Sequence, residues 1–233
     1  GDRDGNPNVT AKVTRRVMII SRWQAADLIN RDLEAIYEEL SVTRATDDLR
    51  AEAGDAREPY RAILKPLRDS VRRQRDELGA YIQDSVNPLP PVLFTADIIA
   101  TLEKCRNSLS EVGLSAIGDG KLLDLVRRLE SFGAHLVTLD VRQESTRHSD
   151  VINEITTALG LGDYTSWSEE DKQAFLKAEI TNPRPLLPLD FVASEPCQEV
   201  IDTFRVIADT PREALGCYVI SMASQPSDVL AVQ

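Results

Sequence analysis

Apolar residues recur at steps of three and four along most of the chain, the spacing that one face of an α-helix requires. This spacing predicts a long helix over residues 10–40 and a second that begins at Pro59, a residue tolerated in the first helical turn. Further helices are predicted over residues 46–53, 95–112, 119–132, 149–159, 168–180 and 194–209, with a last one from Pro226. Several begin at a Ser, Thr or Asp that can cap a helix, so the chain is predicted to be mainly helical.

Two apolar segments depart from the helical spacing and are predicted to be short, buried β-strands. The first runs from Phe132 to Val141, and the second, CYVISM, runs from Cys217 to Met222. About 75 residues of mainly helical pattern separate them without a hairpin signal, which predicts parallel strands joined by helical crossovers. The predicted fold class is therefore predominantly α-helical with a few parallel strands. No domain boundary is predicted within residues 1–233.

A cluster of ionisable residues follows the first predicted strand: Arg142, Glu144, Arg147 and His148. Substrate sites of parallel α/β folds lie at the carboxyl ends of the strands. Arg142 is the best candidate, because its rigid guanidinium can bind a phosphate or a carboxylate through two hydrogen bonds. The alternative is a structural ion pair with Glu144 or with an acid on a neighbouring strand. His148 is a candidate acid or base, although a structural histidine near a helix start is the commoner case.

Other candidate motifs are weaker. Asp2, Asp4 and Asn6 alternate as in a calcium loop, but Pro7 stands where the turn glycine is needed, so calcium binding is rejected. The Gly-Asp-Gly at residues 118–120 lacks the third glycine and the preceding strand of a nucleotide site. His135 is expected on the entrance side of the first strand in a structural role. The two histidines are not spaced like paired metal ligands.

Composition narrows the possible partners. The net charge of −11 argues against a general nucleic-acid partner, which requires a basic surface. No apolar run reaches the length of a membrane span. The odd number of widely spaced cysteines argues against a disulfide framework and fits a reducing cytoplasm. The chain begins without Met and ends in an unfinished helical pattern, so we expect an internal segment of a longer protein.

Three motifs in order resemble the phosphoenolpyruvate carboxylase family: GDRDGNP at residues 1–7, LDVRQES-RH at 139–148 and YVISMA--PSDVLAV at 218–232. The likeness extends over EPYR at 58–61 and RPLLP at 184–188. It implies a large, mainly helical, cytoplasmic homotetramer built round an eight-stranded barrel. The chain is then expected to be a fragment of a helix-rich, TIM-like α/β barrel. Such enzymes join bicarbonate to phosphoenolpyruvate with Mg²⁺ or Mn²⁺, giving oxaloacetate and phosphate.

The resemblance also implies residue roles. Arg142 matches an arginine that contacts the substrate phosphate region, and Arg61 matches a position that helps bind an activating sugar phosphate in plant members. The family's catalytic-histidine motif, metal-binding motif and glycine-rich loop do not occur in this sequence. We therefore expect no metal ligand in this segment and no activity from it in isolation. The alternative function is a non-catalytic helical scaffold or interaction module that retains the fold.

Overall fold

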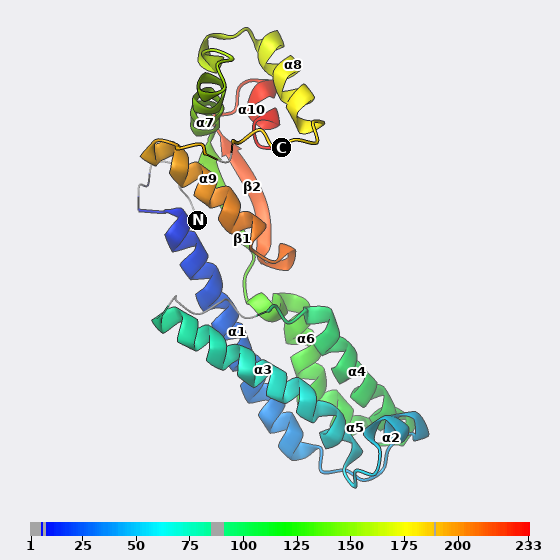
Figure 1. The fold of residues 1–233 in the computed structure, drawn as a ribbon. Helices are drawn as coiled ribbons and strands as arrows, with labels where there is room; N and C mark the ends of the chain where they lie inside the picture. Colours follow the sequence, from blue (N-terminus) through cyan, green and yellow to red (C-terminus); the bar gives the residue numbers. More distant parts are fainter. Residues whose placement is uncertain (1–5, 7, 85–90, 189) are drawn as a thin grey trace. The chain divides into compact units, whose positions relative to one another are not determined.

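The computed structural model describes residue 6 and residues 8–84, 91–188 and 190–233. The described residues form two compact units (Figure 1). The helical unit is residues 16–138, and the strand unit combines the residues up to Arg15 with Leu139–Gln233. The predicted loop at residues 1–7 and the predicted break at residues 87–91 lie largely outside the described residues. In the part that is described, no helix is both long and apolar enough to cross a membrane.

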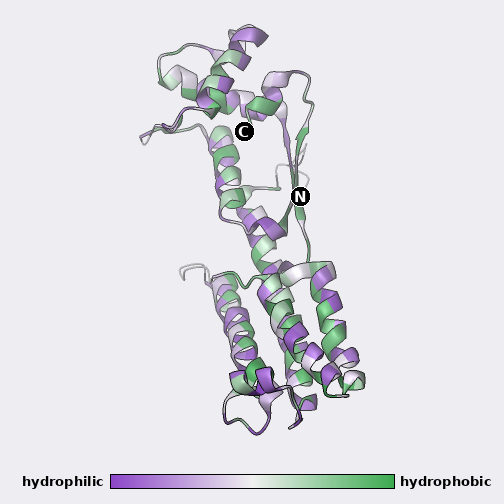
Figure 2. Cartoon of the chain, turned by 90° about the vertical axis from the view of Figure 1, so that its right-hand side faces the viewer, coloured by the Kyte–Doolittle hydropathy of each residue, from purple (hydrophilic) through white to green (hydrophobic). Residues whose placement is uncertain are grey.

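The helical unit is made of amphipathic helices whose positions agree closely with the apolar spacing. Figure 2 shows hydrophobic and hydrophilic residues interleaved along these helices. The main helices are α1 (Ala11–Glu39), which belongs to this unit from Arg16 on, α2 (Asp47–Ala53), α3 (Pro59–Gln83), α4 (Thr95–Glu111) and α6 (Leu123–Phe132). Their core contains Leu33, Tyr60, Leu64 and Leu102, whose side chains are completely buried. Burial of such side chains supplies most of the stability of each helix.

A buried hydroxyl joins three helices in this core. The Ser108 hydroxyl oxygen lies 3.0 Å from the Tyr60 hydroxyl and accepts a hydrogen bond of 3.1 Å from the backbone N–H of Thr46. Ser108 lies in α4 and Tyr60 in α3, and Thr46 directly precedes α2. Because an unpaired buried hydroxyl is costly, this arrangement fixes the three helices against one another.

Two predicted helix caps in this unit are wrong. Thr95 is the first residue of α4, and its hydroxyl accepts a hydrogen bond from the N–H of Ala134 at 2.9 Å instead of capping the helix. Asp119 lies within a π-helical turn, Gly118–Leu122, that follows the short helix α5 (Ser115–Ile117). Its carboxylate forms an ion pair with Arg106 at 3.2 Å. Tertiary contacts thus occupy side chains that local sequence assigns to capping.

The strand unit contains two parallel strands and their connecting helices, as predicted. Strand β1 is Leu139–Glu144 and β2 is Leu215–Ser221. Between and after them lie α7 (Ser145–Ala158), α8 (Glu169–Ile180), α9 (Glu195–Ala208) and α10 (Pro226–Leu230). Short 3₁₀ turns occur at Tyr164–Ser166 and Arg212–Ala214. Helices α7 and α9 pack through a buried cluster of Val151, Ile155, Cys197 and Val200.

Caps in the strand unit are partly as predicted. Ser168 caps α8, since its hydroxyl oxygen accepts from the N–H of Asp171 at 3.2 Å. Ser194 precedes α9 but makes no side-chain cap; its N–H donates to a carboxylate oxygen of Glu154 at 2.9 Å. The first turn of α9 is therefore tied to α7 through Glu154.

The first strand begins later than predicted. Phe132 ends α6, Gly133–His135 form a 3₁₀ turn, and β1 starts only at Leu139. At Leu136 the backbone has a φ of 70°, and the N–H of Val137 bonds to the carbonyl of His135 at 2.9 Å. Ala134 and Leu136 pack against the core of the helical unit, whereas Phe132 and Val137 are exposed. His135 thus belongs to the turn rather than to the strand.

Candidate functional site

Arg142 lies inside β1, two residues before the strand ends, rather than directly after the strand as predicted. Its side chain is exposed, whereas its neighbours Val141 and Gln143 are buried. Successive side chains of a strand point to opposite faces. Arg142 therefore lies on the face opposite to Val141, beside Val219 of β2. Arg142 is therefore an exposed residue of the strand, on the face that does not pack against the interior.

The register of the two strands changes just before Arg142. Leu139 pairs with Leu215, but Val141 pairs with Tyr218, so β2 contains one residue more than β1 between these pairs. This is a β-bulge, in which one residue leaves the regular ladder and the following side chains change face. The carboxylate of Asp140 accepts a hydrogen bond from the N–H of Cys217 at 2.8 Å, within the bulge.

Gly216 makes room for the Asp140 carboxylate. A Cβ atom at Gly216 would lie 2.1 Å from Oδ1 of Asp140, far inside van der Waals contact. Gly216 is not among the glycines with a positive φ, so it is required for space and not for backbone conformation. The sequence signal for this feature is the glycine directly before the apolar segment CYVISM, because glycine in or beside a strand is typical of a bulge or a close approach.

His148 lies in the interior of the strand unit, in the first turn of α7. It is 2% exposed, and its Nε2 lies 2.7 Å from the hydroxyl oxygen of Tyr218. The rings of Tyr218 and Phe204 are stacked at 5.4 Å, and both rings lie close to the His148 ring. Burial lowers the pKa of His148 to about 4, so the imidazole is neutral near pH 7. The surroundings favour a structural role over proton transfer at the exposed strand face.

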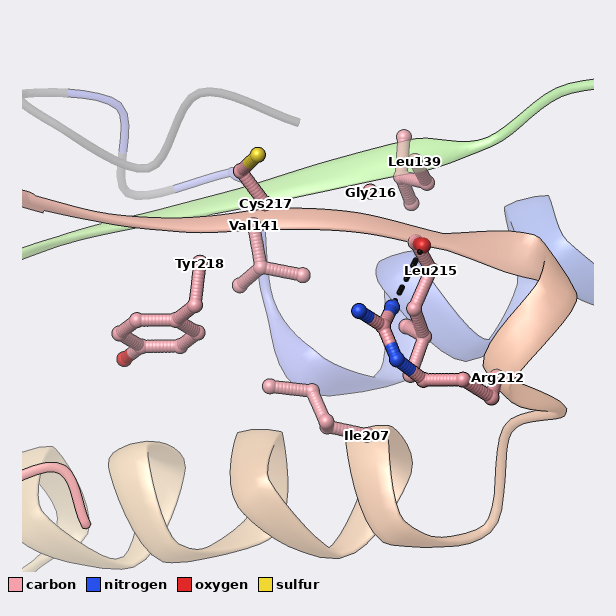
Figure 3. A pocket seen from close by; sticks show the side chains of 8 residues that line it. All are labelled: Leu139, Val141, Ile207, Arg212, Leu215, Gly216, Cys217 and Tyr218. Atoms are coloured by element: carbon pink, nitrogen blue, oxygen red, sulfur yellow. Dashed lines mark hydrogen bonds between the residues drawn. The ribbon is translucent and has the colours of Figure 1, made fainter.

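A cavity of about 280 Å³ separates the sheet from α9 (Figure 3). Its lining is mostly apolar and includes Val141, Ile207 and Tyr218. At its edge, the guanidinium of Arg212 donates to the carbonyl oxygen of Leu215 at 3.0 Å, the contact drawn in Figure 3. Arg142 does not line this cavity and lies on the other face of β1. The cavity and the candidate anion-binding face are therefore separate features.

Arg61 of α3 caps the C-terminal end of α1. Its Nε donates to the carbonyl oxygen of Tyr37 at 2.7 Å, and one terminal nitrogen donates to the carbonyl oxygen of Glu38 at 2.9 Å. These carbonyls belong to the last turn of α1, where intrahelical partners are lacking. The other terminal nitrogen forms an ion pair with Glu58 at 3.0 Å. All three guanidinium nitrogens are therefore engaged within the helical unit.

The ion pair of Arg61 belongs to a wider set of contacts on α3. Hydrogen bonds from Ser41 and Arg61 hold the pKa of Glu58 below its usual value. Arg68 lies over the ring of Tyr37 at 4.2 Å and pairs with Asp69 at 3.0 Å. The basic face that the sequence shows on α3 is thus partly neutralised by neighbouring acids.

Metal-binding chemistry has no support in the described ranges. Across them, no group of three or more His, Cys, Asp or Glu side chains is arranged to hold a metal ion. Cys105 and Cys197 are buried and Cys217 is exposed, and all three are free thiols. Burial raises the pKa of Cys105 to about 12, so it is protonated and unreactive near pH 7.

Comparison with known proteins gives one consistent result. Residues 1–233 match the profile of the family described as phosphoenolpyruvate carboxylase. The chain is 51% identical over 233 residues to the phosphoenolpyruvate carboxylase of Aliivibrio salmonicida and 53% identical over 233 residues to that of Vibrio atlanticus. It is 50% identical over 236 residues to that of Klebsiella pneumoniae. All of this chain is covered in each comparison, but it spans only 27% of each relative.

Proposed function

Because the chain belongs to the phosphoenolpyruvate carboxylase family, we propose that it forms part of an enzyme that carboxylates phosphoenolpyruvate with bicarbonate. The products are oxaloacetate and inorganic phosphate. The proposal includes a cytoplasmic homotetramer in which these residues contribute strands and outer helices to an α/β barrel. The parallel pairing of β1 and β2, with helices between them, is compatible with that architecture.

We propose that Arg142 binds the phosphate group of the substrate. The observation that carries this assignment is the position of Arg142, an exposed residue of β1 close to the carboxyl end, where parallel α/β folds bind substrates. A guanidinium presents donors in a fixed fork that matches phosphate oxygens. Held on a strand, Arg142 orients the phosphate and stabilises the negative charge that redistributes as the phosphoryl group moves.

Mg²⁺ or Mn²⁺ supplies Lewis-acid stabilisation of the anionic reactants in this proposal. The residues described here offer no suitable ligand group, so the metal ligands are proposed to lie elsewhere in the full-length enzyme. The residue that transfers protons is also proposed to lie elsewhere in the full-length enzyme, because His148 is buried and neutral. The isolated chain is accordingly proposed to be inactive. Detectable oxaloacetate formation by the isolated chain would contradict this.

The test uses the full-length carboxylase that carries this segment. Oxaloacetate formation is followed by coupling it to NADH oxidation through malate dehydrogenase. Arg142→Ala is expected to lower kcat/KM for phosphoenolpyruvate by about 100- to 1,000-fold, the usual effect of removing one strong transition-state donor. Arg142→Lys keeps the charge and loses the fork, so an intermediate loss is expected.

Arg73→Ala is the control, because Arg73 is also an exposed arginine but lies in α3, in the helical unit. Its kcat/KM is expected to stay close to that of the unmodified enzyme. If Arg142→Ala also retains near-normal kcat/KM, the assignment of Arg142 to the substrate is wrong.

A further inference from the structure

We propose that Asp140 is a positioning residue for Arg142, acting through the bulge in β2. Its carboxylate binds the N–H of Cys217 and so fixes the strand register that places Arg142 beside Val219. The inference rests on the proposed function of Arg142. It adds a residue that touches no substrate but determines where the phosphate-binding side chain lies.

The bulge is needed because contacts on either side of it demand different registers. On one side, Leu139 pairs with Leu215. On the other, Tyr218 pairs with Val141 and turns its hydroxyl to His148, 2.7 Å away. Without the extra residue in β2, Arg142 would pair with Tyr218. A slip of one residue moves every side chain to the opposite face, so Tyr218 would leave His148 and lie beside Arg142.

Asp140 stabilises the residue that the bulge removes from the regular ladder. A backbone N–H left without an acceptor destabilises the folded state, and a charged acceptor binds it more strongly than a neutral one. The Cys217 N–H has such an acceptor in Asp140 at 2.8 Å. Asp140 and Arg142 are two residues apart on one strand, so they share a face. Any shift of β1 that breaks the Asp140 contact also displaces Arg142.

Gly216 provides independent support for this role. The nearest atom to a Cβ built at Gly216 is Oδ1 of Asp140, at 2.1 Å, and the next is Cγ of the same side chain, at 3.3 Å. The missing side chain of Gly216 is therefore the space in which the carboxylate lies. Strand β2 is built to receive Asp140.

The experiment measures KM for phosphoenolpyruvate and kcat in the full-length carboxylase with Asp140→Ala, Asp140→Asn, Arg142→Ala and the double variant. Asp140→Ala is expected to raise KM by about 10- to 100-fold, because a displacement on the order of 1 Å is enough to cause such a loss. Asp140→Asn keeps an acceptor oxygen of the same size and is expected to restore KM to within about threefold of the unmodified enzyme. Asp55→Ala, which removes an exposed aspartate in the helical unit, is the control for loss of charge.

The double variant distinguishes positioning from general stabilisation. If Asp140 acts through Arg142, Asp140→Ala adds less than about twofold once Arg142 is already alanine, because coupled residues are not additive. Equal losses in both backgrounds, or an Asn variant as impaired as the Ala variant, would overturn the inference. A normal KM for Asp140→Ala, together with severely impaired kinetics for Arg142→Ala, would also overturn the inference. Normal kinetics for Arg142→Ala would instead refute the proposed function of Arg142 itself.

Discussion

The Nε2 atom of His148 and the hydroxyl oxygen of Tyr218 lie 2.7 Å apart, although the two residues are 70 positions apart in the sequence. The contact joins the first turn of α7 to β2. It lies on the side of the sheet opposite to Arg142, and its geometry depends on the bulge that precedes Tyr218. The buried interior and the exposed candidate site are therefore connected through one strand.

Acidification is expected to destabilise the fold through His148. Its pKa is about 4 in the folded protein, against an ordinary value of 6.5 for a solvated histidine, so the unfolded chain binds a proton more readily. The stability that neutral His148 contributes is fully present above pH 6.5 and is lost as the pH falls toward 4. Its upper limit is roughly 3 kcal/mol, at about 1.36 kcal/mol per pKa unit. The measurement is urea unfolding at neutral and at mildly acidic pH. Acidification should lower the free energy of unfolding less in His148→Gln than in the unmodified protein, and equal decreases would contradict this.

Tyr218→Phe is expected to lower the free energy of unfolding by about 1–3 kcal/mol, because it removes the partner of a buried nitrogen. The cost should lie toward the upper end. Within the described residues, the Nδ1 atom of His148 is already buried without a hydrogen-bond partner. Urea denaturation provides the measurement. Tyr81→Phe, at a partly buried tyrosine of α3, serves as the control, and a Tyr218 variant as stable as this control would argue against the contact.

Gly216→Ala and Asp140→Ala are expected to show strong non-additivity in thermal stability. Gly216→Ala alone forces the new methyl group against the Asp140 carboxylate and should cost about 1–3 kcal/mol, as overpacking does. Once Asp140 is alanine, the obstructing carboxylate is absent. The double variant should then unfold at nearly the same temperature as Asp140→Ala. Additive shifts in the unfolding temperature would show that the methyl group meets some other obstacle.

Arg61→Ala is expected to destabilise the helical unit by about 1.5–3 kcal/mol, the range for hydrogen bonds to a charged group. The reason is that two carbonyls in the last turn of α1 lose their donor. Lys65→Ala is the control, since Lys65 is exposed one turn further along α3. Equal stability of the two variants, measured by thermal unfolding, would show that Arg61 is not a structural residue.

The predicted regulatory role of Arg61 requires a separate measurement. Binding of a sugar phosphate would have to compete with the contacts to Tyr37, Glu38 and Glu58. Activation by a sugar phosphate that survives in Arg61→Lys but not in Arg61→Ala would support that role. Loss of stability without any change in activation would assign Arg61 to the fold alone.

Helix positions could be predicted from the sequence because local spacing determines them. Helix α1 begins and ends within one residue of the predicted range, and α8 begins directly after its predicted cap at Ser168. The parallel pairing of the strands also followed from the long helical connection between them. These features depend on periodicity and on chain length, both of which are visible in one sequence.

Features that depend on distant partners could not be predicted in this way. The apolar residues before Leu139 predict a strand, but Leu136 packs against the helical core instead. The bulge requires knowledge of how two segments pair, and neither segment contains that information alone. Residue type and position in the sequence indicate Arg142 as a candidate, and the structure adds that this residue is exposed.

The parallel pairing of β1 and β2 has a consequence for synthesis on the ribosome. Asp140 and Cys217 are 77 residues apart, so β1 is translated long before its partner exists. During that interval its backbone donors and acceptors are open to other chains, which is a known cause of aggregation. Helices α7, α8 and α9 emerge in between and can form locally. The sheet consequently cannot form before Leu215–Ser221 have been synthesised, and nascent chains that stall before residue 215 should depend on chaperones.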